Sequence, residues 1–337
     1  MLLSEYTKLL LPAIEEELKI AVEQAGILED ETLKEMLKYH MGWTGAGSGP
    51  QAQGKRIRPL LLLLTTIANQ GEWQTALPAA AAVELIHNFS LIHDDIEDKS
   101  VLRRGRKTLW TLHQIPLALN AGDSMFSLAF AALGRSSSQL DPQVISQVYH
   151  QLSQTCLKLT QGQHLDLSFE TQDKITTERY FQMIQGKTAA MLAAATQIGA
   201  IIAGKNQAEV EKYRNFGFNL GISFQIQDDI LGIWGDEAIT GKSAASDLIA
   251  RKKSLPILYG LGKNGEFSRA WNTEDINPKN APLLAEILQT EGAYDYAQGQ
   301  VEHYTRLSLS LFDHERPENS GFTALKALAL KLLSRSA

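Results

Sequence analysis

Residues 76–96 read ALPAAAAVELIHNFSLIHDDI, a run rich in alanine, leucine and other good helix formers. This run exceeds the length of an ordinary strand, and a similar run, GKTAAMLAAATQIGAIIAG, spans residues 186–204. Alternating Val, Ile and Thr residues with hairpin turns, which would indicate strands, are not evident. We therefore predict an all-α protein, a bundle of about ten helices or more, in which residues 81–102 form one helix.

The composition indicates a folded protein with a large core. The chain has 337 residues, of which 44% are hydrophobic, and a formal net charge of −6. These values argue against disorder and against generic nucleic-acid binding, which usually needs a basic surface. No break in the pattern resembles a linker between independent cores, so we expect a single domain over residues 1–337. The expected loops are residues 41–54, 134–142, 235–247, 262–282 and 312–321.

The sequence favours a cytoplasmic protein without a membrane span. The first residues, MLLSEYTKLLLPAIEEELKI, lack the basic leading region of a signal peptide. The longest purely apolar run, LLLLL at 60–64, is far shorter than the ~20 residues that cross a bilayer. The one cysteine, Cys156, excludes an internal disulfide and indicates a reducing compartment. Its apolar helical context predicts a packed core thiol.

A first acidic motif, DDIED, ends the opening run. On one helix Asp94 and Asp98 share a face, and Asp95 borders it. Carboxylates at the C-terminal end of a helix are unfavourable because the helix dipole is already negative there, so a cation should compensate. Mg²⁺ suits this role, since it takes oxygen ligands and bridges carboxylates to phosphates. The alternative is a solvated helix end whose acids pair with Arg103 and Arg104.

A second acidic motif, QDDILG, follows about 134 residues later. Asp228 and Asp229 lie there among Phe224, Ile226 and Ile230. Two adjacent aspartates in so apolar a run are costly unless they are paired or bound to a metal. We predict that the two acidic faces oppose each other across a cavity and hold Mg²⁺ ions around one diphosphate.

Basic residues accompany both acidic motifs. The segment GKRIRP places Lys55, Arg56 and Arg58 before an apolar helix, where side-chain cations and free backbone N–H groups suit a phosphate. Lys187 and Thr188 lie at a glycine-marked helix start or kink. The remaining candidates are Arg103, Arg104, Lys242, Lys252 and Lys253. This pattern indicates two anionic groups held close together, one through metals and one directly. Walker and Rossmann glycine patterns are absent, so a nucleotide is not the favoured anion.

These motifs, in this order and spacing, resemble the trans-type isoprenyl diphosphate synthases of the polyprenyl synthetase family. The matching segments are GKRIRP, VELIHNFSLIHDDIEDKSVLRRG, GKTA, FQIQDDILGIWGD and DLIARKKSLP, and they cover roughly residues 50–260. The resemblance implies an all-α isoprenoid synthase bundle around a central active-site cavity, and a homodimer. It also implies head-to-tail condensation of isopentenyl diphosphate with an allylic diphosphate, with roughly three Mg²⁺ ions per active site once substrate is bound.

The resemblance also assigns roles to individual residues. Asp94, Asp95 and Asp98 would bind Mg²⁺ from one side, and Asp228 and Asp229 from the other. Contacts to the allylic substrate or its diphosphate are implied for Arg103, Lys187, Thr188, Gln225, Lys242 and Lys252. Contacts to isopentenyl diphosphate are implied for Lys55, Arg58, His87 and Arg104. No side chain is assigned as acid or base, because in this family the departing diphosphate is thought to take the proton.

Two positions bear on variation within the family. Gly232 stands where many members carry a third aspartate, so we expect weaker reliance on the second half of the metal site. Phe89 lies five residues before Asp94, about 7.5 Å deeper along the helix. With Ser90 beside it, this large ring resembles the short-chain pattern, which favours the twenty-carbon geranylgeranyl diphosphate, with the fifteen-carbon farnesyl diphosphate next. The alternative is that Phe89 merely packs between helices.

Two rival functions remain at this point. A class I terpene cyclase shares the fold and an aspartate-rich motif, but it would not need a phosphate site for a second substrate. A catalytically silent partner subunit of a prenyl synthase tends to lose the acids, whereas this chain retains both pairs.

Overall fold

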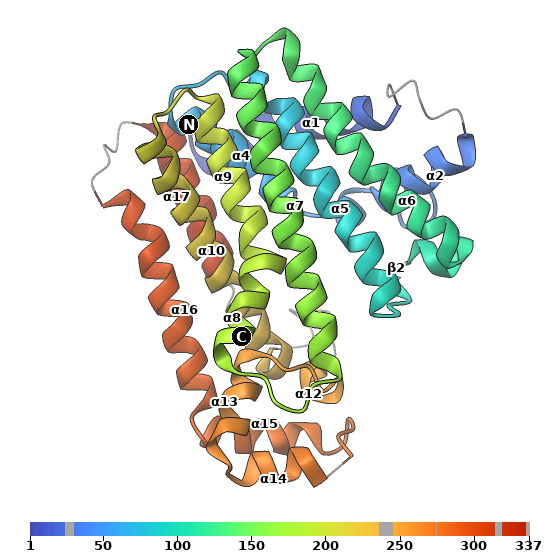
Figure 1. The fold of residues 1–337 in the computed structure, drawn as a ribbon, viewed down its shortest axis with the longest axis vertical. Helices are drawn as coiled ribbons and strands as arrows, with labels where there is room; N and C mark the ends of the chain where they lie inside the picture. Colours follow the sequence, from blue (N-terminus) through green and yellow to red (C-terminus); the bar gives the residue numbers. More distant parts are fainter. Residues whose placement is uncertain (24–29, 236–244, 274, 314–318, 335–337) are drawn as a thin grey trace. The chain divides into compact units, whose positions relative to one another are not determined.

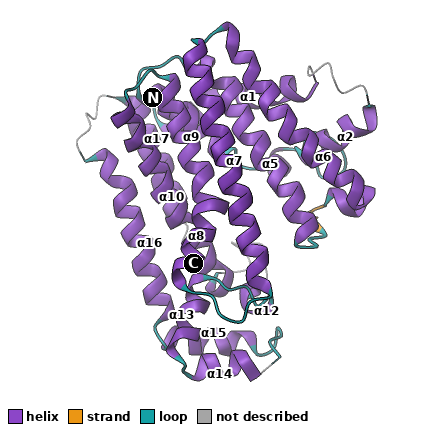
Figure 2. Cartoon of the chain, in the orientation of Figure 1, coloured by secondary structure: helices purple, strands orange, loops and turns teal. Residues whose placement is uncertain are grey.

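The computed structural model describes residues 1–23, 30–235, 245–273, 275–313 and 319–334. Helices make up almost all the regular structure of these residues (Figures 1 and 2). The predicted all-α fold is therefore confirmed. The described residues cluster into two compact units, which we describe separately. The single domain expected from the sequence stays a prediction.

The first unit comprises residues 1–156, 194–213 and 316–325. Its elements are α1 (Leu3–Glu23), α2 (Glu31–His40), α3 (Pro50–Gln53), α4 (Ile57–Ala68), η1 (Trp73–Ala76), α5 (Leu77–Glu97), β1 (Leu102–Arg103), β2 (Arg106–Lys107), α6 (Leu109–Gly134) and η2 (Arg135–Ser138). Four helices contribute residues to both units: α7 (Pro142–Glu170), α9 (Ala190–Ile202), α10 (Gln207–Trp234) and α17 (Ser320–Leu333).

The second unit comprises residues 157–193, 214–315 and 326–337. Its own elements are α8 (Thr177–Ile184), the π-helical turn η3 (Gln185–Ala189), α12 (Ser246–Ile249), α13 (Leu255–Lys263), α14 (Glu266–Thr273), α15 (Ala281–Thr290), α16 (Ala293–Leu309) and η4 (Ser310–Phe312).

The core of the first unit is built from the most apolar helices. All five leucines of the run at 60–64 in α4 are buried, as is most of α5. Helices α5 and α6 lie side by side along much of their length (Figure 1). Helix α4 also lies very close to the residues of α9 in this unit. A Cβ atom on Gly199 would lie 2.4 Å from the Leu62 carbonyl oxygen. Thr66 Oγ1 donates a hydrogen bond to the Gly199 carbonyl, 3.2 Å away.

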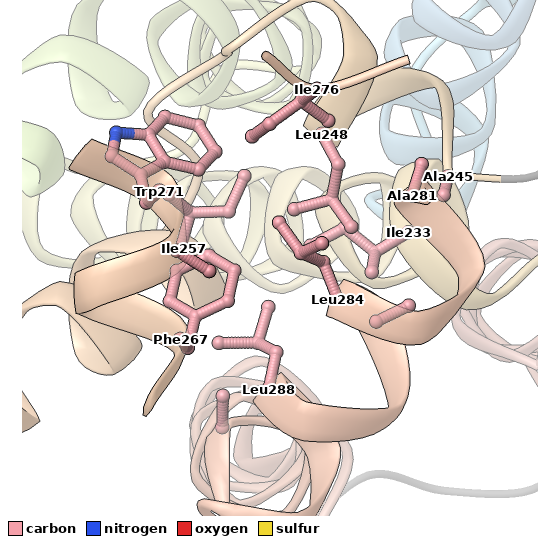
Figure 3. Packing of buried hydrophobic residues seen from close by; sticks show 13 residues of the cluster. Ile233, Ala245, Leu248, Ile257, Phe267, Trp271, Ile276, Ala281, Leu284 and Leu288 are labelled. Carbon is pink, nitrogen blue, oxygen red and sulfur yellow. The ribbon is translucent and has the colours of Figure 1, made fainter. Parts of the chain in front are cut away.

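The second unit has two clusters of buried apolar residues. One gathers residues of α8, α10, α13 and α16. In the other, side chains of α13, α14 and α15 converge with Ile233 and Leu248, as Figure 3 shows. Ile257, Phe267 and Leu288 at its centre are fully buried. These clusters fix the C-terminal part of α10, which carries the second acidic motif, and the helix α13, which begins just after Lys252.

The helix expected over residues 81–102 is wrong at both ends. Helix α5 begins at Leu77 and ends at Glu97, with Asp98 as its C-cap. The chain then forms the short antiparallel hairpin β1–β2, which the sequence analysis did not predict. Its turn uses positive φ values at Arg104 (51°) and Gly105 (74°). Only Gly105 gives a sequence signal for such a turn, since arginine rarely adopts this conformation.

Several expected loops contain helix. Residues 41–54 include α3, residues 134–142 include η2, and residues 262–282 include α14. Of the expected loop 235–247, residues 236–244 lie outside the described residues, and Ser246 and Asp247 belong to α12. Polar composition misled the prediction, because short helices can be polar on their outer face.

Within the described part of the chain, two helical stretches, residues 73–97 and 109–138, are long and apolar enough to cross a membrane by length and composition. The first is largely buried within the protein. Core helices of globular proteins pass the same test. Here α5 and α6 pack against each other as such helices do.

The crossing of α7 and η3 depends on two glycines in the second unit. A Cβ atom on Gly162 would lie 2.1 Å from the Lys187 backbone nitrogen, and one on Gly186 would lie 2.5 Å from the Lys158 carbonyl oxygen. Only the hydrogen atoms of glycine fit between the two backbones. The two glycines therefore fix the position of the Lys187 backbone against α7.

We predict that Gly162→Ala forces α7 and η3 apart and lowers the free energy of unfolding by about 1–3 kcal/mol. Gly299→Ala is the matched control, since Gly299 lies inside α16 with nothing near its absent Cβ. Higher helix propensity should make this control more stable by about 0.5–1 kcal/mol. Urea denaturation of both variants measures the difference, and equal effects would contradict the account.

Candidate active site

The first acidic motif divides its three aspartates by burial. Asp95 is buried, Asp94 is half-buried and Asp98 is exposed at the end of α5. Arg103 Nε donates a hydrogen bond of 2.7 Å to Asp95 Oδ1. Burial raises the pKa of Asp95 to about 6, although the Arg103 guanidinium favours the charged form. The structure thus shows Asp95 paired with Arg103, an arginine that follows the motif.

The hairpin β1–β2 places its other arginines against the glycine-rich segment before α4. Arg104 Nη1 donates to the Ala52 carbonyl at 2.8 Å, and a Cβ atom on Gly54 would lie 2.7 Å from the Arg104 guanidinium. Arg106 donates to the carbonyls of Tyr39, Thr44 and Ala46, at 2.7, 2.6 and 3.0 Å. Arg106 therefore holds the loop, and Gly54 leaves room for Arg104.

The three basic residues of GKRIRP have different surroundings. Lys55 is exposed and Arg58 is half-buried, whereas the Arg56 side chain is buried. Arg56 donates to Glu15 Oε1 at 2.6 Å and to Glu84 Oε1 at 2.9 Å. The expectation that Arg56 faces a phosphate is therefore wrong, because two carboxylates distant in the sequence neutralise it inside the first unit.

Histidine 87 lies on α5 among arginines. Burial lowers the pKa of His87 well below its ordinary value, and the nearby Arg58 and Arg104 guanidinium groups lower it further. His87 is consequently a neutral imidazole that can donate or accept a hydrogen bond. Three of the four residues expected at the isopentenyl diphosphate site, Arg58, His87 and Arg104, are thus brought together in the first unit.

A pocket opens beside this group. Its lining residues are Tyr39, His40, Ala52, Asp95, Arg103, Arg104, Arg106, Lys107, Thr108 and Leu109. Burial and the surrounding arginines lower the pKa of His40 to about 3, and its Nε2 is a buried atom without a hydrogen-bond partner. The sequence analysis did not identify His40. The lining combines one buried carboxylate with several cations, a suitable chemistry for an anion.

The second acidic motif separates its two aspartates even more clearly. The buried Asp229 Oδ2 accepts from the Tyr180 hydroxyl at 2.6 Å and from the Leu255 backbone N–H at 3.2 Å. Its Oδ1 accepts from Gln225 Nε2 at 3.0 Å and lies 3.8 Å from Lys252 Nζ. Asp228 is half-buried. Asp229 therefore already has a full set of protein partners, and its metal-binding role stays a prediction.

Polar side chains link η3 to this motif. Thr188 Oγ1 donates to Gln225 Oε1 at 2.6 Å, and Gln225 in turn contacts Asp229. Lys187 forms an ion pair with Asp166 of α7. The predicted helix start or kink at residues 186–188 is a π-helical turn that follows α8 directly. Single-turn π-helices occur often at functional sites.

The two lysines before α13 have different partners. Lys253 Nζ donates to the carbonyl oxygens of Phe169 and Gln172, so it ties this segment to the end of α7. Lys252 Nζ lies 3.8 Å from both Asp229 Oδ1 and Asp247 Oδ2. Burial opposes the charge on Lys252, but these carboxylates outweigh it and raise its pKa.

Phe89 contacts other aromatic rings in the first unit. Its centroid lies 4.8 Å from that of His93 and 5.1 Å from that of Phe126. Phe130 and Tyr149 continue the row at 5.2 and 6.2 Å. Phe89 thus packs between α5 and α6, and the row of rings behind it limits how far it can move. Ser90 Oγ donates to the His87 carbonyl at 2.8 Å, within α5.

A family model described as polyprenyl synthetase matches residues 46–288 of this chain. The chain belongs to the polyprenyl synthetase family. It is 36% identical over 290 residues to a geranylgeranyl diphosphate synthase of Saccharolobus solfataricus, covering 84% of this chain and 87% of the relative. It is 33% identical over 292 residues to a (2E,6E)-farnesyl diphosphate synthase of Mycobacterium tuberculosis, covering 84% and 80%.

The fold comparison agrees with this membership of the polyprenyl synthetase family. A geranylgeranyl pyrophosphate synthetase from Pyrococcus horikoshii superposes with a TM-score of 0.88 at 30% identity, over 99% of this chain and 98% of that chain. The resemblance drawn from the sequence motifs is therefore confirmed, as are the isoprenoid synthase fold and the prenyltransferase class.

Members of this family use Mg²⁺, and the donor chemistry of the second unit fits it. Four carboxylates, Asp166, Asp228, Asp229 and Asp247, act on Lys252, and Lys187 pairs with Asp166. Among the described residues, these four carboxylates thus lie near two ammonium groups. The part of the chain that the structure describes has no group of three His, Cys, Asp or Glu side chains placed to bind a metal alone. A Mg²⁺ ion whose ligands are one or two carboxylates together with substrate phosphates and water is consistent with both observations.

The structure also adds residues to the predicted set. Asp166, Tyr180 and Asp247 were missed, although each contacts a predicted site residue. Asp166 had a signal, since it lies one helical turn after Gly162 on the face that meets η3. Lys242 lies outside the described residues. The two acidic motifs belong to different units, so their expected opposition across a cavity stays a prediction.

The raised pKa of Asp95 predicts a pH effect on the metal-free protein. Because the folded state binds this proton more tightly than the unfolded chain, stability falls as pH rises through the interval from 3.8 to about 6. The full effect above that interval is about 2–3 kcal/mol. Asp95→Asn should remove it.

The measurement is urea denaturation with a chelator present, at pH values on both sides of this interval. Asp173→Asn serves as the control, because Asp173 is an exposed carboxylate of the second unit. Parallel pH curves for wild type and Asp95→Asn would show that Asp95 ionises normally.

Proposed function

We propose that this protein condenses isopentenyl diphosphate with an allylic diphosphate, head to tail, and releases a short all-trans prenyl diphosphate. Geranylgeranyl diphosphate is the favoured product and farnesyl diphosphate the next. The observation that carries the proposal is the group of Arg58, His87 and Arg104 beside the acidic end of α5. Such a site serves two anionic substrates, one held by cations directly and one through metal-bound carboxylates.

The residues divide into two binding roles. Lys55, Arg58, His87 and Arg104 would hold the diphosphate of isopentenyl diphosphate, with His87 donating a hydrogen bond as a neutral imidazole. Asp94, Asp98 and Asp228 would hold Mg²⁺, which when bound neutralises the charge of a departing diphosphate. Asp95 and Asp229 would assist from buried positions where arginine, tyrosine and amide groups fix their orientation.

The remaining polar residues would orient the allylic diphosphate. Lys187 and Lys252 would do so as cations, and Thr188 and Gln225 as hydrogen-bond donors, with Arg103 beside Asp95. Lys242 keeps the same proposed role. In the reaction the allylic C–O bond breaks, the alkene of isopentenyl diphosphate forms the new C–C bond, and a proton is lost. No described side chain needs to act as base, since the released diphosphate can accept that proton.

Product length depends on the row of aromatic rings behind Phe89. Because Phe126 and Phe130 support it, the Phe89 ring can serve as a rigid floor for a growing apolar chain. Ser90 is the small neighbour of Phe89 on α5, and its hydroxyl is bonded to the His87 carbonyl. Curated relatives carry the names of both farnesyl and geranylgeranyl diphosphate synthases, so the comparisons are compatible with either length.

The wider setting of the proposal is a cytoplasmic homodimer. Helix α6 exposes Leu112, Ile115, Leu117 and Leu119, which is an unusual density of large apolar side chains. A second copy of the same chain would cover this face. A terpene cyclase or a silent partner subunit would account less well for the paired carboxylates together with the second cationic group.

Product analysis of the purified protein tests the proposal. The protein is incubated with Mg²⁺, isopentenyl diphosphate and, separately, the five-, ten- and fifteen-carbon allylic diphosphates, and the chain lengths formed are resolved. Condensation supports the proposal. Release of a hydrocarbon would favour a cyclase, and the absence of any reaction would favour a silent subunit.

The aromatic floor leads to a specific expectation for product length. We predict that Phe89→Ala lengthens the main product by one or more five-carbon units, and that Phe89→Ala/Phe126→Ala lengthens it further. Tyr149→Phe is the control, since it keeps the last ring of the row and should leave the product unchanged. Elongation by the wild type to thirty carbons or more would keep the enzyme class but refute Phe89 as the floor.

A further inference from the structure

Arg56 has an unusual backbone conformation for an arginine. Its φ of 47° and ψ of 41° lie in the left-handed region, directly before the first residue of α4. This conformation is unfavourable for a residue with a Cβ atom, so it persists only where the surrounding structure holds it. The strained turn lies between Lys55 and Arg58, the two basic residues of this segment that we assign to isopentenyl diphosphate.

The side chain of Arg56 is held through all three of its nitrogen atoms. Nε donates to Glu15 Oε1 at 2.6 Å, and Nη1 donates to Glu84 Oε1 at 2.9 Å. Nη2 donates to Glu15 Oε2 and to the Met41 carbonyl, both at 3.4 Å. The Arg56 side chain is only 1% exposed. Helix α1, the end of α2 and helix α5 thus meet at this one guanidinium group.

The two carboxylates around Arg56 have further partners. Trp43 Nε1 donates to Glu15 Oε2 at 2.8 Å, and Asn88 Nδ2 donates to Glu84 Oε1 at 3.2 Å. A buried ion pair adds little stability compared with well-packed apolar residues of the same size, because desolvation of the charges offsets their attraction. The main effect of this network is therefore to fix where Arg56 lies.

The network lies next to the cationic group of the proposed site. Glu84 and His87 are three residues apart on α5, so they are neighbours on one face of the helix. Burial lowers the pKa of His87, and the Arg58 guanidinium close to the ring lowers it further. Through its pair with Glu84, Arg56 therefore sets the start of α4 against the turn of α5 that carries His87.

A second left-handed arginine precedes a site lysine in the second unit. Arg251 has a φ of 50°, its Nη1 donates to the Trp271 carbonyl at 2.8 Å, and its guanidinium lies 5.3 Å from the centre of the Trp271 ring. Lys252 follows it directly. Of the eight described non-glycine residues with positive φ, three are arginines, namely Arg56, Arg104 and Arg251. Each of them is a residue of the proposed site or the direct neighbour of one.

We propose that Arg56 is a positioning residue for the site of isopentenyl diphosphate. Its ion pairs with Glu15 and Glu84 hold the left-handed turn, and this turn places Lys55 and Arg58 around the diphosphate. Arg56 itself does not touch the substrate, because its charge is already neutralised inside the first unit. This inference rests on the proposed function and deepens it, since it divides the basic segment into residues that bind and one that orients them.

The first test compares two arginine-to-lysine variants. Inorganic diphosphate is titrated into the full-length protein by isothermal calorimetry, once with a chelator and once with Mg²⁺. Arg56→Lys keeps the charge but removes the planar fork that holds Glu15 and Glu84 together. Arg135→Lys is the matched control, because Arg135 also pairs with a glutamate of α1, Glu17, but has an ordinary φ of −67°.

We expect Arg56→Lys to weaken the binding of diphosphate in the chelator by about 10- to 100-fold, as is typical when a group that orients ligating residues is lost. The additional binding that requires Mg²⁺ should stay within about twofold of wild type, because its carboxylates do not depend on this turn. In the condensation assay the KM for isopentenyl diphosphate should rise by a similar factor, and the KM for the allylic diphosphate should not. Arg135→Lys should behave as the wild type does.

Two triple variants separate orientation from charge compensation. Arg56→Met/Glu15→Gln/Glu84→Gln leaves no unpaired buried ion, so it should fold. Nothing then holds the left-handed turn, and the binding of diphosphate in the chelator should be as weak as in Arg56→Lys. Arg56→Gly/Glu15→Gln/Glu84→Gln should recover part of the affinity, because glycine adopts a positive φ without steric cost.

Three results would overturn the inference. The first is wild-type affinity for diphosphate in the chelator in Arg56→Lys or in the methionine triple variant. The second is an equal loss with the chelator and with Mg²⁺, which would indicate that Arg56 only stabilises the fold. The third is a glycine triple variant that binds no better than the methionine one. If Arg56→Lys does not fold, the two triple variants decide.

The condensation assay of the wild type separates this inference from the proposed function. A wild type that condenses its substrates, while Arg56→Lys binds diphosphate normally, would refute only the role of Arg56. A wild type that forms no condensation product would refute the proposed function. The calorimetry with inorganic diphosphate needs no reaction, so it would still decide whether Arg56 orients the basic segment.

Discussion

The cost of placing carboxylates inside apolar helices is the constraint on which the rest of this structure depends. Each buried acid among the described residues has a partner: Glu84 has Arg56, Asp95 has Arg103, Asp229 has Tyr180 and Gln225, and Asp247 has Lys252. An unpaired buried carboxylate would become protonated or would destabilise the fold. The hydrogen bonds and ion pairs inside both units offset this cost.

The two acidic motifs follow the same plan. In each pair of adjacent aspartates one is buried and fixed by protein groups, Asp95 and Asp229, while Asp94 and Asp228 are less buried. Successive residues of a helix point about 100° apart, so one member of a pair faces the core when the other faces a ligand. The buried member can thus orient the helix end, and the other remains available to a metal.

Composition and periodicity were sufficient to predict the all-α fold, because long alanine- and leucine-rich runs have no other stable arrangement. They could not predict where α5 ends, since the hairpin after it contains a left-handed arginine, Arg104, that donates to the Ala52 carbonyl of α3. The glycine-marked kink at Lys187 was found because glycine has a local signal. The π-helical form of that turn was not found, because no local sequence pattern indicates it.

Site residues were predictable where a family motif carries them, and less so where tertiary contacts define them. Arg56 belongs to the same basic cluster as Lys55 and Arg58, yet its partners, Glu15 and Glu84, lie 41 and 28 residues away. Asp247 was missed for the same reason. It approaches Gly232 across residues 236–244, outside the described residues, and no periodic pattern connects the two positions.

The central claim is that one diphosphate is held directly by basic side chains and another through metal-bound carboxylates. Isothermal titration of the protein with inorganic diphosphate, with Mg²⁺ and then with a chelator, tests it most directly. The account predicts one class of site with the chelator and an additional class with Mg²⁺, because acidic faces repel a bare diphosphate. The same number of sites under both conditions would contradict it.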